Sequence, residues 1–204
     1  MYETGSEDRV VPVPNLLDYF RTSIERVMSD QGVDVRPHTA HYVVNLLTLF
    51  SRSEELYDPD CDGRRHKPLA LMLADAEDAA TPEQQNHALQ RIGDVALFFA
   101  GFFADSLATH VVDVDYYVHM GGSAYGSLSE KVRGTFRGHA FAKTYGELAA
   151  KFQLLVDVLN EMRDRERNDS DIDVLRTYTV WRKTGSKRAE RLLRQCGVVP
   201  MFNH

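Results

Sequence analysis

Imidazole and carboxylate side chains are concentrated in two short segments of the chain. Asp115 and His119 are four residues apart and would share one face of a helix. His38 and His41, three residues apart, would do the same. Imidazole nitrogens and carboxylate oxygens are common ligands of transition metals. The candidate ligands for a metal or a haem iron are His38, His41, His110, Asp115 and His119.

This candidate metal set departs from the helical metal sites that are best understood. A ferritin-like dimetal bundle uses two Glu-x-x-His motifs, and the sequence contains none. No motif for haem attachment or axial ligation occurs either. The same segment also has ordinary structural roles, because Asp113 can cap a helix and His119 can be a hydrogen-bonded, partly buried side chain. Both interpretations stay open at this point.

Small residues form an unusual surface on the same predicted helix. Gly122 and Gly126 are one helical turn apart, and Gly121 lies beside them. Glycine has no Cβ atom, so another helix or a flat ligand can approach its main chain closely. Close helix crossing is the ordinary explanation, and a bound ligand is the alternative. The candidate ligand-binding residues are Tyr117, His119, Gly121, Gly122 and Tyr125.

The end of the chain is basic although the whole chain is acidic. Residues 170–204 carry seven basic and three acidic residues, a balance of +4 in a chain of formal net charge −6. Two short helices around Gly185 would present these cations to an acidic protein or a nucleic acid. Alternatively, the helices dock on the acidic body and use the cations there. The candidate partner-binding residues are Arg182, Lys183, Lys187, Arg188 and Arg191.

An apolar segment next to these candidates predicts the element that positions them. Ten apolar or glycine residues run without interruption from Val95 to Ala104, and four of them are phenylalanines. The run is too short to cross a bilayer, which takes roughly 20 residues. We therefore expect a central, aromatic-rich helix enclosed by other helices.

Capping residues and apolar spacing predict the surrounding helices. Asn15, Pro37 and Thr81 mark helix starts, and Gly32 marks an end. The expected helices cover about 16–31, 37–56, 68–79, 82–104, 113–133, 139–167, 172–183 and 187–196. The predicted fold class is all-α, a single compact bundle of about seven to eight helices around the aromatic-rich helix.

The composition is that of one globular domain with appendages. The chain has 204 residues, of which 43% are hydrophobic and 26% charged. We expect a flexible N-terminal arm over 1–14, a helical core over 15–168, and a basic C-terminal helical hairpin over 169–204 that packs on the core. The arm lacks the pattern of an export signal, and the two cysteines suggest neither a disulfide framework nor a zinc site. We expect no membrane span, and we expect the protein to reside in the cytoplasm.

The sequence leaves three hypotheses for function. The first is a non-enzymatic binding or adaptor protein that uses the glycine surface or the basic hairpin, with a second copy of the chain among its candidate partners. The second is a helical-bundle enzyme or sensor with a metal or haem, and the third is nucleic-acid binding through the C-terminal helices. The net charge argues against a nucleic-acid binder that uses its whole surface.

Overall fold

The part of the chain that the structure describes is built from helices. A computed structural model describes residues 15–51, 67–107, 113–134, 138–167 and 174–199. Within these ranges there is no β-strand, and the predicted all-α fold class is confirmed. The helices are α1 (Leu16–Gln31), α2 (Pro37–Phe50), α3 (Leu69–Glu77), α4 (Pro82–Phe102), α5 (Ala104–Leu107), α6 (Val114–Arg133), α7 (His139–Ala150), α8 (Phe152–Arg167), α9 (Val174–Thr184) and α10 (Lys187–Gln195).

Local capping sets several of these helix ends where the sequence predicts them. The Asn15 side chain accepts a hydrogen bond from the Leu17 amide at 3.0 Å, and Thr81 caps α4 in the same way. Gly32 ends α1 with φ of 63°, the left-handed conformation that glycine adopts without strain. None of the described helices is both long enough and apolar enough to pass through a bilayer.

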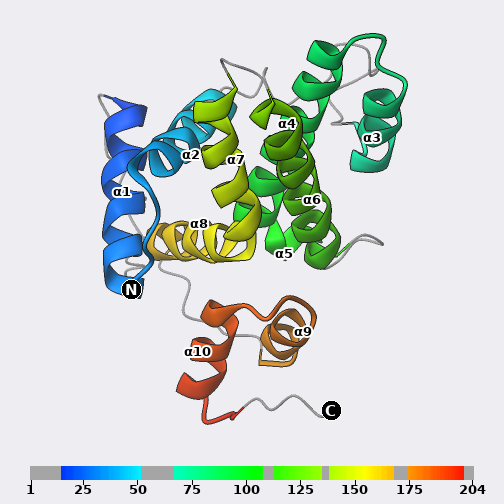
Figure 1. Ribbon diagram of the computed structural model, residues 1–204. Helices are drawn as coiled ribbons and strands as arrows, with labels where there is room; N and C mark the ends of the chain where they lie inside the picture. Colours follow the sequence, from blue (N-terminus) through cyan, green and yellow to red (C-terminus); the bar gives the residue numbers. More distant parts are fainter. Residues whose placement is uncertain (1–14, 52–66, 108–112, 135–137, 168–173, 200–204) are drawn as a thin grey trace, which may run out of the picture.

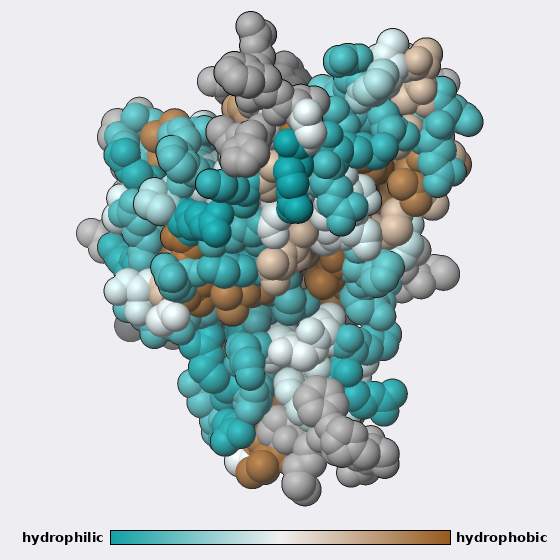
Figure 2. Space-filling view, viewed as in Figure 1, coloured by the Kyte–Doolittle hydropathy of each residue, from teal (hydrophilic) through white to brown (hydrophobic). Residues whose placement is uncertain are grey.

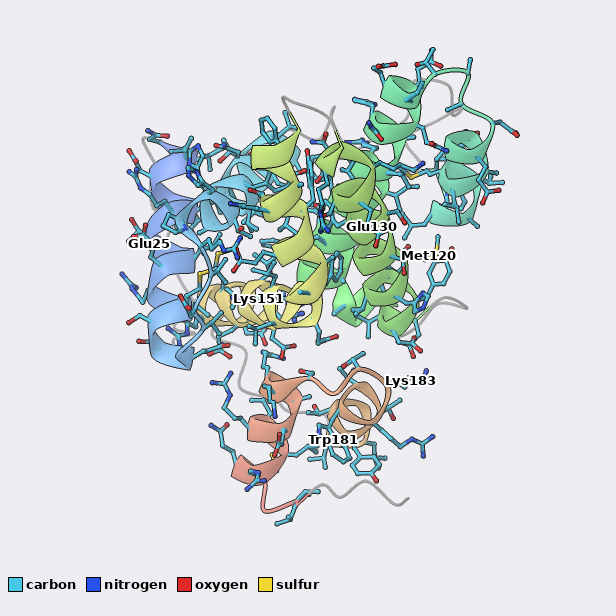
Figure 3. All side chains as sticks on the ribbon, viewed as in Figure 1. Glu25, Met120, Glu130, Lys151, Trp181 and Lys183 are labelled. Atoms are coloured by element: carbon cyan, nitrogen blue, oxygen red, sulfur yellow. The ribbon has the colours of Figure 1, made fainter. Side chains whose placement is uncertain are left out.

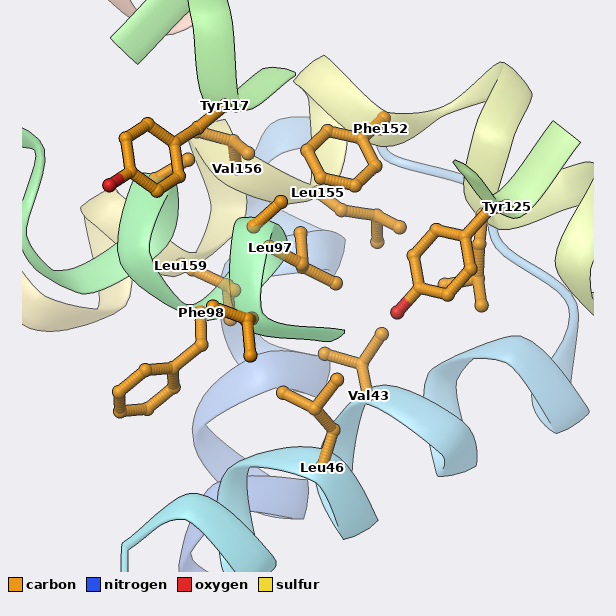
Figure 4. Packing of buried hydrophobic residues seen from close by; sticks show 14 of the residues in the cluster. Val43, Leu46, Leu97, Phe98, Tyr117, Tyr125, Phe152, Leu155, Val156 and Leu159 are labelled. Atoms are coloured by element: carbon orange, nitrogen blue, oxygen red, sulfur yellow. The ribbon is translucent and has the colours of Figure 1, made fainter. Parts of the chain in front are cut away.

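The centre of the fold is α4, which packs against α2, α3, α6 and α8. Its Ile92, Ala96, Leu97 and Ala100 are completely shielded from solvent. Figure 4 shows this packing, with side chains of α2, α6 and α8 meeting those of α4. Burial of each large apolar side chain contributes roughly 1.5–3 kcal/mol, so this core is the main source of stability.

The aromatic run is central, but it is not enclosed on every side. Phe98 is buried and stacks on Phe102, whereas Phe103 is 42% exposed. The predicted helix stops at Phe102, since Phe103 has the non-helical angles φ −117° and ψ 19°, and the single turn α5 follows. The expected full enclosure of Val95–Ala104 therefore applies to Val95–Gly101, except for the half-buried Phe99, and not to Phe102–Ala104.

One predicted helix is divided in two. The sequence predicts a continuous helix over 139–167, but Lys151, with φ −109° and ψ 18°, separates α7 from α8. The apolar spacing continues through the break, so periodicity does not reveal it. The bend directs α8 across the ends of α1, α4 and α6 (Figure 1).

The last two helices form a hairpin with a small core of its own. Trp181, Ala189 and Leu193 are buried between α9 and α10, apart from the main hydrophobic cluster. In Figure 1 this hairpin lies below α8, and in Figure 2 it forms the narrow lower lobe of the molecule. The predicted N-terminal arm, 1–14, and the predicted end of the second helix, 52–56, lie outside the described residues.

Candidate functional site

A buried polar cluster joins four helices near the centre of the molecule. The hydroxyls of Tyr42 on α2 and Tyr125 on α6 both donate to Asp94 Oδ1 on α4, each at 2.6 Å. Gln90, one turn before Asp94, donates to the Tyr42 hydroxyl at 3.1 Å. The Tyr145 ring of α7 stacks on Tyr125 with 6.0 Å between ring centroids. The cluster therefore connects α2, α4, α6 and α7.

Burial shifts the proton affinities of this cluster. Loss of water raises the pKa of Asp94 to about 6, although the two tyrosine hydrogen bonds act to lower it. Burial, together with the Asp94 charge, also raises the pKa values of Tyr42 and Tyr125 far above the ordinary value. The tyrosines are therefore hydrogen-bond donors at neutral pH, and the carboxylate is held in place by them.

A second polar group lies at the start of α2 and is organised by a buried glutamate. Glu147 of α7 accepts hydrogen bonds from Thr39 Oγ1 at 2.6 Å and from the Arg36 amide at 3.2 Å. Lys151 Nζ donates to the other carboxylate oxygen at 2.8 Å and to the Asp34 carbonyl at 2.5 Å. Burial acts to raise the pKa of Glu147, but these bonds outweigh it and the pKa lies below its ordinary value.

An open groove of about 620 Å³ lies beside Glu147, between the start of α2, the end of α6 and the length of α7. It is lined by Asp34, Arg36, Arg133, Ala142, Lys143, Gly146, Glu147, Ala150 and Lys151. The surface over these helices is mostly hydrophilic in Figure 2, and Lys151 is labelled at the α7–α8 bend in Figure 3.

Three cations of this groove have no acidic partner in the part of the chain that the structure describes. Arg36, Arg133 and Lys143 are exposed, and no carboxylate there pairs with their side chains. Lys151 is the groove cation that is paired, through Glu147. Because the chain as a whole has a formal charge of −6, the groove is a local site of opposite sign.

Few features of the sequence predict this groove. Arg36 and Lys143 are isolated cations more than a hundred positions apart, and neither belongs to a charge run. Arg133 and Lys143 come together because α6 and α7 are neighbours in chain order and pack along each other. The one signal is the basic end of the glycine-rich helix, where Lys131 and Arg133 occupy the last turn.

Polar contacts between α8 and the start of α10 hold the C-terminal hairpin on the rest of the protein. Asp157 of α8 accepts hydrogen bonds from Ser186 Oγ at 2.8 Å and from the Arg188 amide at 3.2 Å, at the first turn of α10. Ser186 itself caps α10 by accepting from the Ala189 amide at 3.0 Å. A cavity of about 70 Å³ lies at this contact, and the buried Arg188 Nε there is 3.5 Å from Glu161 Oε2, an ion pair without a hydrogen bond.

Some of the basic residues predicted to bind a partner are paired with acidic groups of the protein, and others are exposed. Lys183 bonds to Asp113, and Arg188 pairs with Asp164 and Glu161 of α8. Lys187 lies 3.9 Å from Glu190 within α10. Arg182 and Arg191 are exposed and have no acidic partner in the described ranges. Lys183 and Arg188 therefore attach the hairpin to the acidic body. This docking is the second of the two roles that the sequence allowed for the basic helices.

The candidate metal ligands are not gathered into a site by the described residues. His38 and His41 are exposed on α2, and His119 is exposed on α6 near the half-buried Asp115. His110 lies outside the described residues. Within the described ranges no three His, Cys, Asp or Glu side chains form a group that could hold a metal ion. Asp113 caps α6 by accepting from the Val114 amide at 2.7 Å, its ordinary alternative role.

The candidate ligand surface on α6 is occupied by neighbouring helices. A Cβ atom on Gly121 would lie 2.3 Å from Phe152 Cζ and 2.7 Å from Ala96 Cβ. Gly122 has more room, with Phe152 Cβ at 3.7 Å. Tyr117 and Tyr125 are buried, while His119 points to the exposed side of the helix. The geometry at Gly121 is that of close helix crossing.

Comparisons with known proteins add no family to this description. No protein-family model matches the chain, and no curated protein or solved structure matches it.

Proposed function

We propose that this chain is a non-enzymatic binding protein and that its groove between α2, α6 and α7 receives an anionic partner. The observation that carries the proposal is the set of three exposed cations, Arg36, Arg133 and Lys143, around one groove with no acidic partner among the described residues. Grooves lined by one sign of charge concentrate ligands of the opposite sign and accelerate their association.

The buried carboxylate of the groove supports binding in preference to catalysis. Glu147 already accepts hydrogen bonds from Thr39, Lys151 and the Arg36 amide. A general base needs a carboxylate that can reach and accept a substrate proton, and one with a lowered pKa is a weak base. Glu147 therefore fastens α7 to the start of α2 and shapes the groove.

The basic C-terminal helices are the weaker candidate for the same role. Lys183 and Arg188 make ion pairs with the body, and only their release would make them available to a partner. Arg182 and Arg191 are available, but they line neither the groove nor the cavity at the base of the hairpin. The metal or haem alternative, cytoplasmic residence and self-association stay predictions.

The test compares two triple charge reversals of equal size. One combines Arg36→Glu, Arg133→Glu and Lys143→Glu, and the control combines Arg182→Glu, Lys187→Glu and Arg191→Glu on the hairpin. All six residues are exposed, so both variants should keep the helical circular dichroism of the parent. The probes are fluorescent oligoglutamate and a single-stranded oligonucleotide, followed by anisotropy at low salt.

We expect at least one polyanion to bind, and the groove reversal to weaken it by about tenfold or more, since three exposed ion pairs are lost and repulsion replaces them. The control reversal should leave most of the affinity. The proposal fails if neither polyanion binds, or if the hairpin reversal weakens binding as much as the groove reversal does.

A further inference from the structure

The cations of the groove are distributed toward its two ends. Lys143 and Arg133 lie near the start of α7, where α6 ends. Arg36 and Lys151 lie near the end of α7, where Lys151 also holds the Asp34 carbonyl. Lys143 and Lys151 are eight positions apart, which on an α-helix corresponds to about 12 Å along the axis.

The wall between these two ends is made of small side chains. Ala142, Gly146 and Ala150 recur at intervals of four along α7 and line the groove. At Ala142 and Gly146 the small side chains let Ser129 of α6 approach, since Ser129 Oγ donates to the Ala142 carbonyl at 2.8 Å and lies 3.1 Å from where a Gly146 Cβ would be. The exposed part of the wall is at Ala150, where there is room for a chain to lie against the helix. An extended peptide advances about 3.3 Å per residue, so the span between the two ends matches about four of its residues.

The lining favours a peptide over a nucleic acid or a polyphosphate. Asp34 and Glu147 carry negative charge beside the cations, and they would repel an unbroken row of phosphates. The exposed Asp34 carboxylate can instead accept a peptide N–H. Single-strand sites usually stack bases on aromatic rings, and the residues that line this groove include no aromatic side chain.

We propose that the groove binds an extended acidic peptide segment whose carboxylates, about four residues apart, meet the cations at its two ends. This preference rests on the proposed function, because it names the partner of the same groove. The peptide lies along α7, with Lys143 and Arg133 at one end and Arg36 and Lys151 at the other.

The experiment uses the full chain and labelled peptides of about twelve residues, long enough to span the groove. One peptide has glutamates at every fourth position in a serine background, and the second has the same composition with the glutamates adjacent. Tripolyphosphate and a single-stranded oligonucleotide are the competitors. The spaced peptide should bind about fivefold more tightly than the clustered one, since it alone reaches both ends.

A bulky, uncharged substitution tests whether the peptide occupies the groove itself, because it narrows the groove without changing its charge. Ala150→Phe places a ring on the exposed part of the wall, and Ser123→Phe places the same ring on the exposed face of α6 as a control. Ala150→Phe should weaken the spaced peptide severalfold, whereas Ser123→Phe should not. Each end is tested singly by Lys143→Glu and Arg36→Glu, which should remove most of the advantage of the spaced peptide.

The outcomes distinguish this inference from the proposed function. If the spaced and clustered peptides bind equally, or if tripolyphosphate or the oligonucleotide binds the groove more tightly, the peptide preference is wrong. The proposed function still stands in that case, provided the triple groove reversal abolishes binding. If no polyanion binds at all, the proposed function is wrong and the peptide preference with it.

Discussion

The hydroxyl of Tyr125 donates to Asp94 Oδ1 across 2.6 Å, and this bond joins α6 to α4 in the interior of the molecule. Tyr125 is fully buried and its ring lies against Gly93, where a Cβ atom would come within 2.6 Å of the ring. The position of the ring therefore depends on a glycine one residue before the carboxylate that the hydroxyl binds.

The stability of the protein should fall over the pH range in which Asp94 is ionised in the unfolded chain but still protonated in the folded protein. Burial raises its pKa from 3.8 to about 6, so between these values the folded protein keeps a proton that the unfolded chain has released. The free energy of unfolding should therefore decrease as pH rises from about 4 to about 6, by up to about 3 kcal/mol from this group.

Asp94→Asn tests this pH dependence, because the amide keeps an oxygen that can accept both tyrosine bonds but carries no charge. Urea unfolding of the parent and the variant at several pH values gives the difference in their free energies of unfolding. That difference should shift in favour of the variant between about pH 4 and about pH 7. Glu130→Gln, at an exposed position, is the control. Parallel curves for the parent and Asp94→Asn would contradict the prediction.

Gly121→Ala should destabilise the fold, whereas Gly122→Ala should not. The new Cβ at position 121 would overlap Phe152 and Ala96 at 2.3 Å and 2.7 Å, and overpacking of this kind costs about 1–3 kcal/mol. At position 122 the nearest atom is 3.7 Å away, and alanine gains up to about 1 kcal/mol in helix propensity. Urea unfolding of both variants is the measurement. Equal stability of the two would show that α6 and α8 do not cross closely.

Asp157→Ala should loosen the C-terminal hairpin before the core unfolds. The substitution removes the acceptor for Ser186 Oγ and for the Arg188 amide, which together hold the first turn of α10 on α8. Loss of a buried acceptor of this kind costs about 1–3 kcal/mol. Trp181 is the only tryptophan of the chain and is 3% exposed, so its emission reports on the hairpin.

In Asp157→Ala we expect the tryptophan emission to shift to longer wavelength at lower urea than the loss of helical circular dichroism. In the parent the gap between the two transitions should be narrower. Arg191→Ala, on the exposed face of α10, should behave like the parent. Coincident transitions in the Asp157 variant would mean that the hairpin and the core unfold as one unit.

Glu147→Ala should cost more stability than Lys151→Ala. Loss of Glu147 leaves the buried Thr39 hydroxyl and the Arg36 amide without their acceptor, whereas loss of Lys151 removes a half-exposed partner. The pKa of Glu147 lies below its ordinary value of 4.5, so its contribution is present above that pH and lost as pH falls through the folded pKa. Thermal unfolding of both variants at neutral and acidic pH measures this, and a Glu147 deficit that does not shrink in acid would contradict it.

Much of the fold could be predicted from the sequence because the signals that set it are local. The caps at Asn15, Thr81 and Asp113 and the left-handed end at Gly32 act over a few residues of backbone. The burial of most of Val95–Gly101 follows from the length and composition of the apolar run alone. The division at Lys151 could not be predicted, since the apolar spacing of α7 continues into α8.

The candidate groove and the polar cluster were decided by tertiary structure. Tyr125 stands out in the sequence, but its partner Asp94 is recognisable only as the boundary of an apolar run, and Tyr42 lies 52 positions from Asp94. Arg36 and Lys143 become parts of one groove only when α2 and α7 pack together. Local sequence determines where helices begin, end and bury a face, whereas contacts between distant residues depend on which helices cross and at what angle. The helices and the buried centre of this protein were therefore determined by the sequence itself, and the site proposed to bind its partner was determined by the packing of those helices.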